Sequence, residues 1–413
     1  MRWARTLPKP TAQVSLSRFW YDQGVLGVLS VVAGIANYFF SVALAHELGP
    51  RRFGAVATLL NIVAILLIPL PAAALLYTRI GRRPGARAEA SLLWLLGLAL
   101  FAVPLVLGSD IRALFRLRTL DIGAFAGAVV PSFAYAANLG ALQRSRRYLA
   151  VGLLGAATSF LNLFAVLVAL SLFGAELWVL GLALSLVSWL VWLASRFLSR
   201  ELPAGEPTPT SKVLFGTAAA GALATLYSLS DSLVARHVLP PVAAGYYIGV
   251  STIGSALSYF ATPFGTVMLT AALEEPEATP SFLKRALLLF GVTSGLGELL
   301  LLAATRPLIR AVLGEAFLPA SPYLAPYGLA MIALGLVDIL LLYSVASGRW
   351  PPLTLAALGY GVWLLSLTTA RSLSDLTFRT LWAFAATGAA MALSLAVSGR
   401  SRGEAAAVRQ RRT

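Results

Sequence analysis

One of the two histidines of this 413-residue chain opens the stretch His46-Glu47-Leu48-Gly49-Pro50-Arg51-Arg52-Phe53-Gly54. The other opens His237-Val238-Leu239-Pro240-Pro241-Val242-Ala243-Ala244-Gly245. Both stretches read H-x-L-x-P-x-x-x-G, and they are offset by 191 residues. Each follows one long apolar segment and precedes another. This pattern predicts a chain made of two similar halves, an organisation typical of transporters whose halves move around a central site.

The composition places the chain in a membrane. Hydrophobic residues make up 58% of it and charged residues only 12%, whereas a soluble domain carries about 25% charged residues. A span of the bilayer needs about 20 apolar residues. Twelve runs are long enough: 24–46, 54–78, 88–108, 121–142, 148–171, 175–198, 213–236, 243–272, 284–305, 321–347, 351–370 and 376–398. We therefore expect an all-α polytopic protein with twelve transmembrane helices.

The distribution of basic residues orients these spans. The side that carries both termini holds 22 of the basic residues, and the opposite side holds 10. The positive-inside rule therefore places both termini in the cytoplasm. The net charge of +15 is explained by this orientation, so nucleic-acid binding is not expected. The first apolar run is too long for a cleavable signal peptide, and we expect a multi-pass protein of the cytoplasmic (inner) membrane.

Three loops support the division into halves. Besides the histidine stretches, the loop between the third and fourth spans carries Arg112 and Arg116. The loop between the ninth and tenth spans carries Arg306 and Arg310 at the same spacing. Both loops read as short amphipathic surface helices. Arg147-Tyr148 and Arg349-Trp350 end the next pair of loops. Because six spans is an even number, the two six-helix repeats are parallel and should surround a central cavity. The predicted parts are a cytoplasmic segment 1–23, an N-lobe 24–198, a linker 199–212, a C-lobe 213–398 and a basic tail 399–413.

The residue inventory argues against catalysis. There is no cysteine, and with two histidines and 17 acids neither a metal cluster nor a bound cofactor is expected. No Ser/His/Asp set and no nucleotide-binding loop is present. A membrane enzyme such as a polysaccharide polymerase or a lipid-linked glycosyltransferase remains a weaker alternative. Such enzymes usually carry a large outer loop, whereas the outer connections here are short and their charge is chiefly arginine.

Several motifs are similar to those of one transporter family. The stretch from Ala43 to Gly54 resembles the turn between the first two helices of bacterial polysaccharide flippases, which often reads A-R-x-L-G-P-x-x-F/Y-G. These flippases belong to the multidrug/oligosaccharidyl-lipid/polysaccharide exporter (MOP) superfamily. Further similar motifs are Asp231-Ser-Leu-Val-Ala-Arg236, Gly245-Tyr246-Tyr247, Gly314-Glu-Ala-Phe317 and Ser347-Gly348-Arg349. One departure is that His46 stands where the family commonly has arginine.

The resemblance implies a flippase that moves a polyprenyl-diphosphate-linked oligosaccharide across the membrane by alternating access, for surface polysaccharide assembly. The partners would then be this lipid-linked substrate, membrane lipids, and the polysaccharide polymerase and glycosyltransferases of the same assembly route, with the flippase itself a monomer. A cation-coupled small-molecule exporter of the same superfamily is the alternative, motivated by the acids of the second half.

Polar residues inside the spans are the candidate site residues. A charge at membrane depth costs about 2.5–3.5 kcal/mol, so it usually faces a cavity or a partner. Asp231, Glu298 and Asp338 qualify. Each either pairs with an arginine or caps a helix, or it forms an ion or proton site. Asn37 and Asn61 complete the candidate substrate cavity with Asp231 and Asp338, because the first two helices line the cleft in the resembling family. Hydrogen bonding between helices is the alternative for each asparagine, as it is for Asn138 and Asn162.

Charged residues at the helix ends supply the remaining candidates. Arg18 and Arg79 lie at the cytoplasmic ends of the first two spans, where they either contact a diphosphate at the inner mouth or anchor the helices by the positive-inside effect. His46 and His237 lie at the outer membrane edge. They are candidates for an outer turn that acts as a gate, and the alternative is an interfacial hydrogen bond that only holds the turn.

Overall fold

The computed structural model describes residues 16–70, 73–74, 87–145, 147–200, 212–274 and 279–410. Within these residues every regular element is a helix, which confirms the predicted all-α class. The N-terminal half contains α1 (Leu16–Leu66), α3 (Arg87–Val106), α4 (Gly108–Phe115), α5 (Thr119–Ala126), α6 (Val129–Arg144), α7 (Tyr148–Phe173) and α8 (Leu177–Leu198).

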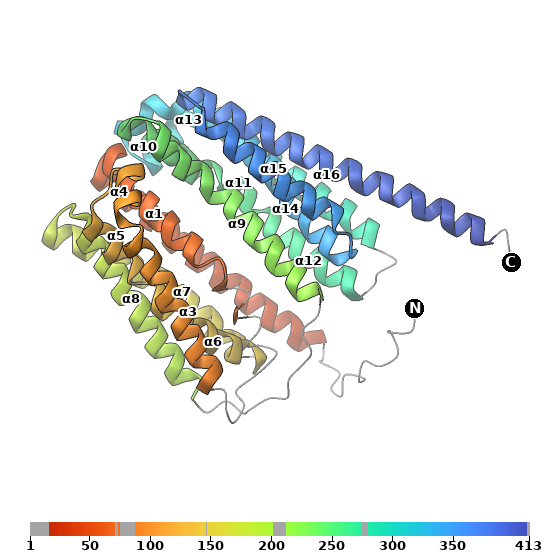
Figure 1. The fold of residues 1–413 in the computed structure, drawn as a ribbon, viewed down its shortest axis with the longest axis horizontal. Coiled ribbons are helices and arrows are strands. Elements are labelled where there is room, and N and C mark those ends of the chain that lie inside the picture. Colours follow the sequence, from red (N-terminus) through yellow and green to blue (C-terminus); the bar gives the residue numbers. More distant parts are fainter. Residues whose placement is uncertain are drawn as a thin grey trace.

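The C-terminal half begins at α9 (Lys212–Val238) and has a similar series of helices. It contains α10 (Pro241–Gly254), α11 (Ala256–Tyr259), α12 (Ala261–Glu274), α13 (Thr279–Val312), the short 3-10 helix η3 (Glu315–Ala320), α14 (Ser321–Ala346), α15 (Pro351–Thr368) and α16 (Leu373–Gln410). Figure 1 shows the first seven helices gathered in one group and the helices from α9 onward in another.

The helices are long and apolar enough for a membrane protein. In the described part of the chain, eight helices have the length and composition to cross a bilayer, or up to nine if α3 and α4, which meet at a bend of 58°, form one span. Large apolar side chains face outward from several of them, as lipid contact requires; examples are Phe164, Leu186, Leu296, Leu299, Val362 and Leu365. The chain is therefore a multi-pass membrane protein, and the full count of twelve spans stays a prediction.

Gly49 divides α1 into two segments. It is the one residue of α1 with non-helical backbone angles (φ 62°, ψ 175°), a conformation open to glycine because it has no β-carbon. The next residue, Pro50, begins the second segment, where its missing N–H costs no helical hydrogen bond. The first two predicted spans therefore correspond to the two segments of α1, joined at the first histidine stretch.

Two structural features repeat between the halves. The predicted amphipathic helix after the third span is α4, and the corresponding region of the second half lies beyond a break in α13 at Ala304. The arginines of the equivalent loops make the same contact. Arg147 donates from Nη1 to the carbonyl oxygen of Leu198 at 3.3 Å, and Arg349 donates from Nη1 to that of Leu395 at 3.2 Å. Each arginine thus binds the last helix of its own half.

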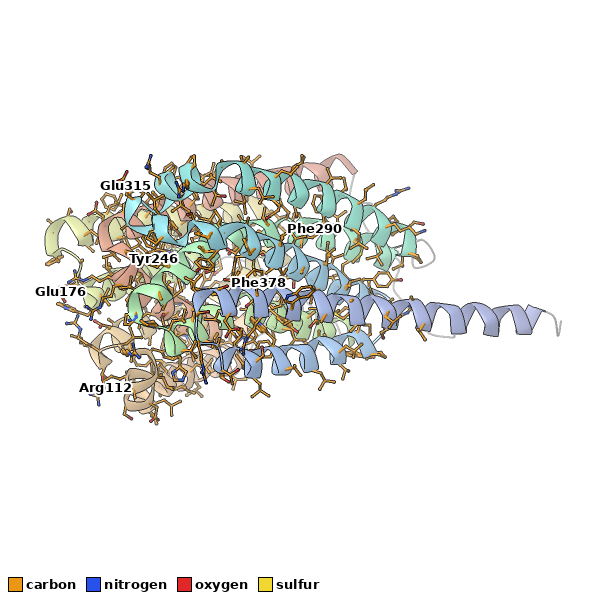
Figure 2. The ribbon with its side chains drawn as sticks, turned by 90° about the horizontal axis from the view of Figure 1, so that it is seen from above. Arg112, Glu176, Tyr246, Phe290, Glu315 and Phe378 are labelled. Carbon is orange, nitrogen blue, oxygen red and sulfur yellow. The ribbon has the colours of Figure 1, made fainter. Side chains whose placement is uncertain are left out.

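The two ends of the molecule differ. Figure 1 places the start of α1 and the end of α16 at the same end. Figure 2 shows Arg112 and Glu315, from predicted outer connections, and Glu176, at the start of the sixth predicted span, at the opposite end. The start of α1 and the end of α16 therefore lie at one end of the described chain, and which side of a membrane this end faces stays a prediction. Residues 1–15, 201–211 and 411–413 of the predicted terminal segments and linker lie outside the described residues.

Candidate functional site

The most enclosed candidate residue is Asp231, seven residues before the end of α9. Its side chain is fully buried. One carboxylate oxygen, Oδ1, accepts from the backbone N–H of Ser232 at 2.6 Å and from the Ser232 hydroxyl at 3.2 Å. The other, Oδ2, accepts from the hydroxyls of Tyr327 at 2.6 Å and Tyr247 at 3.0 Å. Each of these donors is neutral, so the carboxylate is solvated by hydroxyl groups and a backbone amide inside the second half.

The hydroxyl groups around Asp231 extend into a network that joins five helices. The Tyr247 hydroxyl on α10 lies 3.4 Å from Oγ1 of Thr380 on α16, and Nε1 of Trp363 on α15 donates to the same oxygen at 3.4 Å. Tyr327 brings in α14. Buried polar groups need such partners, because an unpaired one costs about 1–3 kcal/mol. A carboxylate surrounded by hydroxyl oxygens can hold a proton or a small hard cation, which prefers oxygen ligands.

Arg236, five residues after Asp231, does not neutralise it. Its guanidinium is buried and donates from Nε to the carbonyl oxygen of Phe115 at 3.2 Å. The structural alternative left by the sequence was an arginine partner or a helix-capping role for each acid. The donors to Asp231 are hydroxyl and amide groups, so none of these donors is an arginine.

The other two acids lie apart from Asp231. Glu298 on α13 is buried, and neither carboxylate oxygen has a hydrogen-bond partner among the described residues. It faces Gly328 of α14, where a β-carbon would overlap Oε2 of Glu298. The neighbouring Tyr327 binds Asp231. Successive helical residues point about 100° apart, so the two acids meet different faces of α14. Asp338 lies further along α14 and is half-buried, with its Oδ1 buried and unpartnered among the described residues.

The three acids therefore occupy separate positions in the second half and do not form one cluster. In the part of the chain that the structure describes, no group of three or more His, Cys, Asp or Glu residues could hold a metal ion. Of the two roles considered for Asp231, its enclosure within one half favours the ion or proton site over direct contact with a substrate between the halves.

The asparagine and arginine candidates of the first half are only partly described. Asn37 is exposed on the first segment of α1, and Asn61 is half-buried on the second segment, equally far along the chain from Gly49. Asn138, by contrast, binds α8, donating to Ser195 at 3.0 Å and accepting from Ser199 at 3.2 Å. Arg18 lies in α1 with a side chain that is not described, and Arg79 falls outside the described residues.

Each histidine of the repeated stretches contacts the opposite half. The His46 ring packs against Gly314, where a β-carbon would lie 3.3 Å from the ring atom Cδ2, and its Nδ1 lies 3.0 Å from the carbonyl oxygen of Val42. Nδ1 of His237 lies 3.3 Å from the carbonyl oxygen of Leu114 on α4. Arg236 binds the next carbonyl, that of Phe115. Two basic side chains of α9, Arg236 and His237, therefore contact the C-terminal carbonyls of α4. This position is favourable because the last carbonyls of a helix lack helical partners and carry partial negative charge.

The glycines that end the repeated stretches meet between the halves. A β-carbon on Gly54 would lie 3.0 Å from Cα of Gly245, and one on Gly245 would overlap the carbonyl oxygen of Pro50. The rings of Phe53 and Phe317 meet edge to face nearby, with centroids 5.7 Å apart. We refer to these contacts, with those of His46, Arg236 and His237, as the outer seam. It joins α1 and α4 to α9, α10 and η3.

The sequence signals found some of these residues and missed others. The repeated stretches marked both histidines and both glycines of the outer seam. The partners of Asp231 were missed, because a tyrosine in an apolar segment carries no sign of which helix its hydroxyl will meet. Tyr247 is part of the motif Gly245-Tyr246-Tyr247, which was compared with the flippase family. That motif was the one sequence signal that could have marked Tyr247 as a site residue.

Comparison with known proteins identifies the fold. No family model matches the chain, and no curated protein matches it. A solved lipid II flippase, MurJ, in an inward closed conformation, matches with a TM-score of 0.71 and 14% identity over 90% of this chain and 87% of that one.

Two multidrug transporters match as well. An inward-facing MATE family transporter of the MOP superfamily has a TM-score of 0.68 and 13% identity, covering 91% of this chain and 94% of its own. A mutant of the MATE transporter VcmN of Vibrio cholerae has a TM-score of 0.60 and 16% identity, covering 92% of this chain and 98% of its own. This chain therefore has the fold of transporters of the MOP superfamily, a fold it shares with a flippase and with multidrug exporters.

Proposed function

We propose that this protein is a flippase that moves a polyprenyl-diphosphate-linked oligosaccharide across the cytoplasmic membrane by alternating access. The observation that carries the proposal is the outer seam, at which each half contacts the other through its copy of the same stretch. Together with a fold shared with a lipid II flippase, the seam supports a mechanism in which the outer ends of two lobes, 24–198 and 213–398, close while the opposite side admits substrate.

The proposed roles rest on the positions of these residues in the sequence and, for Asp231, on its described contacts. Arg18 and Arg79, predicted from the sequence at the cytoplasmic ends of the first two spans, would contact the diphosphate, because one guanidinium group can bind two phosphate oxygens. Asn37 and Asn61 would offer hydrogen bonds to the sugars. Asp338 is the proposed residue of the substrate cavity from the second half. Asp231, Glu298 and Asp338 are the proposed ion or proton positions, with Asp231 favoured by its four neutral donors.

The proposal includes no catalytic step and no cofactor. The lipid tail stays in the bilayer and only the polar head crosses, so the work of the protein is to supply a hydrated path. The proposed setting is the inner membrane with both termini cytoplasmic. The proposed partners are the lipid-linked substrate, membrane lipids, and a polymerase and glycosyltransferases that use or make the substrate, with the protein itself a monomer.

Reconstituted vesicles test the proposal directly. Purified protein is inserted with a polyprenyl-diphosphate oligosaccharide labelled on its sugar, and an impermeant lectin measures how much label reaches the outer leaflet. We expect protein-dependent exposure of the sugar, reduced by the double variant Arg18→Gln with Arg79→Gln. Sugar exposure equal to that of protein-free vesicles would contradict the flippase proposal.

A cation-coupled exporter of small molecules is the second candidate, favoured by the Asp231 site and the likeness to multidrug transporters. The same vesicles distinguish the two. An exporter would accumulate a fluorescent organic cation when a sodium or proton gradient is imposed, and Asp231→Asn would abolish the accumulation. Accumulation that ignores both gradients would count against this candidate, whatever the outcome of the lectin assay.

A further inference from the structure

A cavity lies at the termini-bearing end of the second half, away from both the outer seam and the Asp231 site. Its volume is about 270 Å³, and it lies between the first turns of α9 and the loop that joins α14 to α15. Arg349, Trp350, Val345, Leu353 and Gly216 line it. Arg349 is the one charged residue that lines this cavity among the described residues, so the cavity carries an uncompensated positive charge.

One nitrogen of the Arg349 guanidinium has a hydrogen-bond acceptor, and another has none among the described residues. Its Nη1 donates to the carbonyl oxygen of Leu395 on α16 at 3.2 Å, which fixes the guanidinium without removing its charge. Its Nε is buried and has no hydrogen-bond partner among the described residues. A buried donor without an acceptor is costly, and more so when it belongs to a charged group. An anionic oxygen in the cavity would supply both the missing acceptor and the missing charge.

The surroundings of Arg349 favour an anion as well. The 18-residue helix α15 begins at Pro351, directly beyond Trp350, and the N-terminus of a helix carries partial positive charge that favours a phosphate. Because Pro351 and Pro352 have no backbone N–H, the hydrogen bonds to an anion would come chiefly from the guanidinium. Guanidinium groups bind phosphate with two parallel hydrogen bonds, which makes this group a better match than a halide or a single carbonyl oxygen.

The remaining walls indicate a lipid as the source of the phosphate. Val345 and Leu353 are aliphatic, and an inorganic phosphate ion gains nothing from them. Trp350 is exposed, at a helix end, where tryptophan side chains commonly sit at the level of lipid headgroups. The end concerned is the predicted cytoplasmic side, whose leaflet is the one that attracts basic side chains when it is rich in anionic lipid.

We propose that the cavity between α9, α14 and α15 binds the phosphate of an anionic membrane phospholipid, with Arg349 as its principal ligand and Val345 and Leu353 against the acyl chains. This site is separate from the transported substrate and does not depend on which molecule the protein moves. It would make the second half sensitive to the lipid composition of the inner leaflet.

Native mass spectrometry of the full-length protein, released from detergent, tests the proposal. The protein is titrated with phosphatidylglycerol, with zwitterionic phosphatidylcholine, and with inorganic phosphate. We expect phosphatidylglycerol to bind most tightly, and Arg349→Gln to weaken it about tenfold, the effect of losing about 1.4 kcal/mol. Arg349→Lys should recover part of the affinity because it keeps the charge.

The repeat supplies a matched control. Arg147→Gln removes the equivalent contact, to Leu198, and should leave lipid binding unchanged. Leu353→Trp fills the cavity without altering Arg349 and should also weaken binding, which keeps the test valid if Arg349→Gln folds poorly. Equal effects of the Arg147 and Arg349 variants, equal binding of the two lipids, or inorganic phosphate binding as tightly as phosphatidylglycerol would each overturn the proposal.

Discussion

Gly245 faces Pro50 across the two halves so closely that a β-carbon on Gly245 would overlap the carbonyl oxygen of Pro50. Both residues belong to the repeated histidine stretches. The contact involves backbone atoms, so rotation of a side chain cannot relieve it. Any larger residue at this position must separate α10 from α1, so these two positions limit how closely the two helices approach.

The first prediction concerns this glycine. We expect Gly245→Ala to destabilise the closed outer seam by about 1–3 kcal/mol, the usual cost of inserting a methylene group into a packed contact, and so to favour conformations with the seam open. Because the chain has no cysteine, spin labels can be attached at cysteines introduced at Glu47 and Val242, both exposed. The distance between the labels should increase.

Gly221→Ala on α9 is the matched control for Gly245→Ala. A β-carbon there would meet nothing within 4 Å, so the label distance should stay as in the parent protein. An unchanged distance in Gly245→Ala would show that the seam accommodates the added carbon and does not act as a gate.

A second prediction concerns Arg236. Its Nε donates to Phe115 in the opposite half, and we expect Arg236→Gln to weaken seam closure by about 1.5–3 kcal/mol, the range for hydrogen bonds to charged groups. The same pair of spin labels measures the change. Arg310→Gln serves for comparison, since Arg310 pairs with exposed Glu315 at 3.3 Å and exposed pairs contribute about 0–1 kcal/mol. Equal effects of the two variants would argue against a specific role for Arg236.

A third prediction separates packing from ion coupling at Asp231. Asp231→Leu leaves four donors without their acceptor and should lower the free energy of unfolding by several kcal/mol, at about 1–3 kcal/mol for each unpaired buried group. Asp231→Asn keeps the shape and one acceptor oxygen, and should fold with a smaller loss. Thermal unfolding in detergent measures both.

If Asp231 holds the coupled ion, the well-folded Asp231→Asn protein should lose the dependence of transport on a sodium or proton gradient. Tyr327→Phe, which removes only the 2.6 Å donor, should weaken the dependence without abolishing it. Gradient dependence that survives in Asp231→Asn would place the coupling elsewhere.

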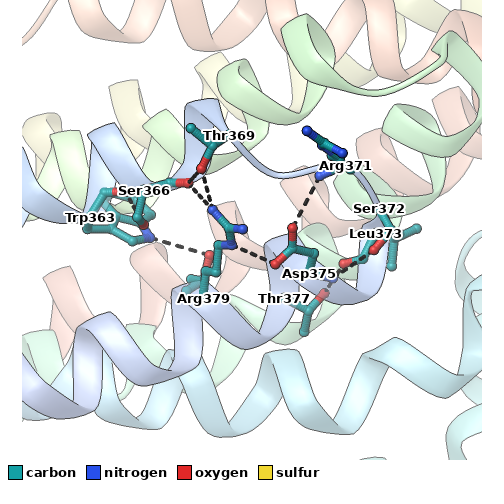
Figure 3. Close-up of polar contacts among 10 residues, drawn as sticks. Trp363, Ser366, Thr369, Arg371, Ser372, Leu373, Asp375, Thr377 and Arg379 are labelled. Carbon is teal, nitrogen blue, oxygen red and sulfur yellow. Dashed lines mark hydrogen bonds and ion pairs between the residues drawn. The ribbon is translucent and has the colours of Figure 1, made fainter.

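A fourth prediction concerns the join between α15 and α16. Figure 3 shows Arg379 binding Asp375 at 2.5 Å, the carbonyl oxygen of Ser366 at 2.5 Å and the hydroxyl of Thr369 at 2.6 Å. The arginine binds one carbonyl in the last turn of α15, that of Ser366, and an acid in the first turn of α16. We expect Arg379→Met to lower the melting temperature, with a loss of about 1.5–3 kcal/mol.

Arg371→Met is the control for Arg379, because Arg371 contributes to the same group of contacts through its backbone N–H, which donates to Asp375 at 3.2 Å. Its melting temperature should match that of the parent. A similar fall in both variants would indicate a general effect of removing positive charge from this end of the molecule.

The order of the helices was largely predictable from hydrophobicity. The runs 148–171, 175–198 and 351–370 coincide with α7, α8 and α15 to within a few residues, since a membrane span must satisfy its backbone hydrogen bonds within one helix. The breaks within helices were harder to predict. The breaks between α10, α11 and α12 fall inside one apolar run, 243–272. Pro263 follows the second break and cannot donate to the carbonyl of Tyr259 four residues earlier, whereas hydrophobicity alone gives no sign of either break.

The candidate site was predicted unevenly. Asp231 was identified because an acid is rare in an apolar segment, and its two tyrosine partners were missed because their hydroxyls belong to residues 16 and 96 positions away. The loop arginines Arg147 and Arg349 were matched correctly as a pair. Each arginine binds the last helix of its own half. The sequence could not predict this contact, because it requires that helix to end beside the loop that carries the arginine.

The sequence by itself determined that this chain lies in a membrane, that it repeats, and which stretches correspond, because those properties depend on residue type and spacing. Only the tertiary structure decided that His46 reaches Gly314 and His237 reaches Leu114, so that each stretch binds the opposite half. It also placed Asp231 among hydroxyl groups and left Nε of Arg349 without an acceptor among the described residues. The physical reason is that contacts between distant segments depend on how helices pack, and hydrophobic patterning specifies only which faces are buried.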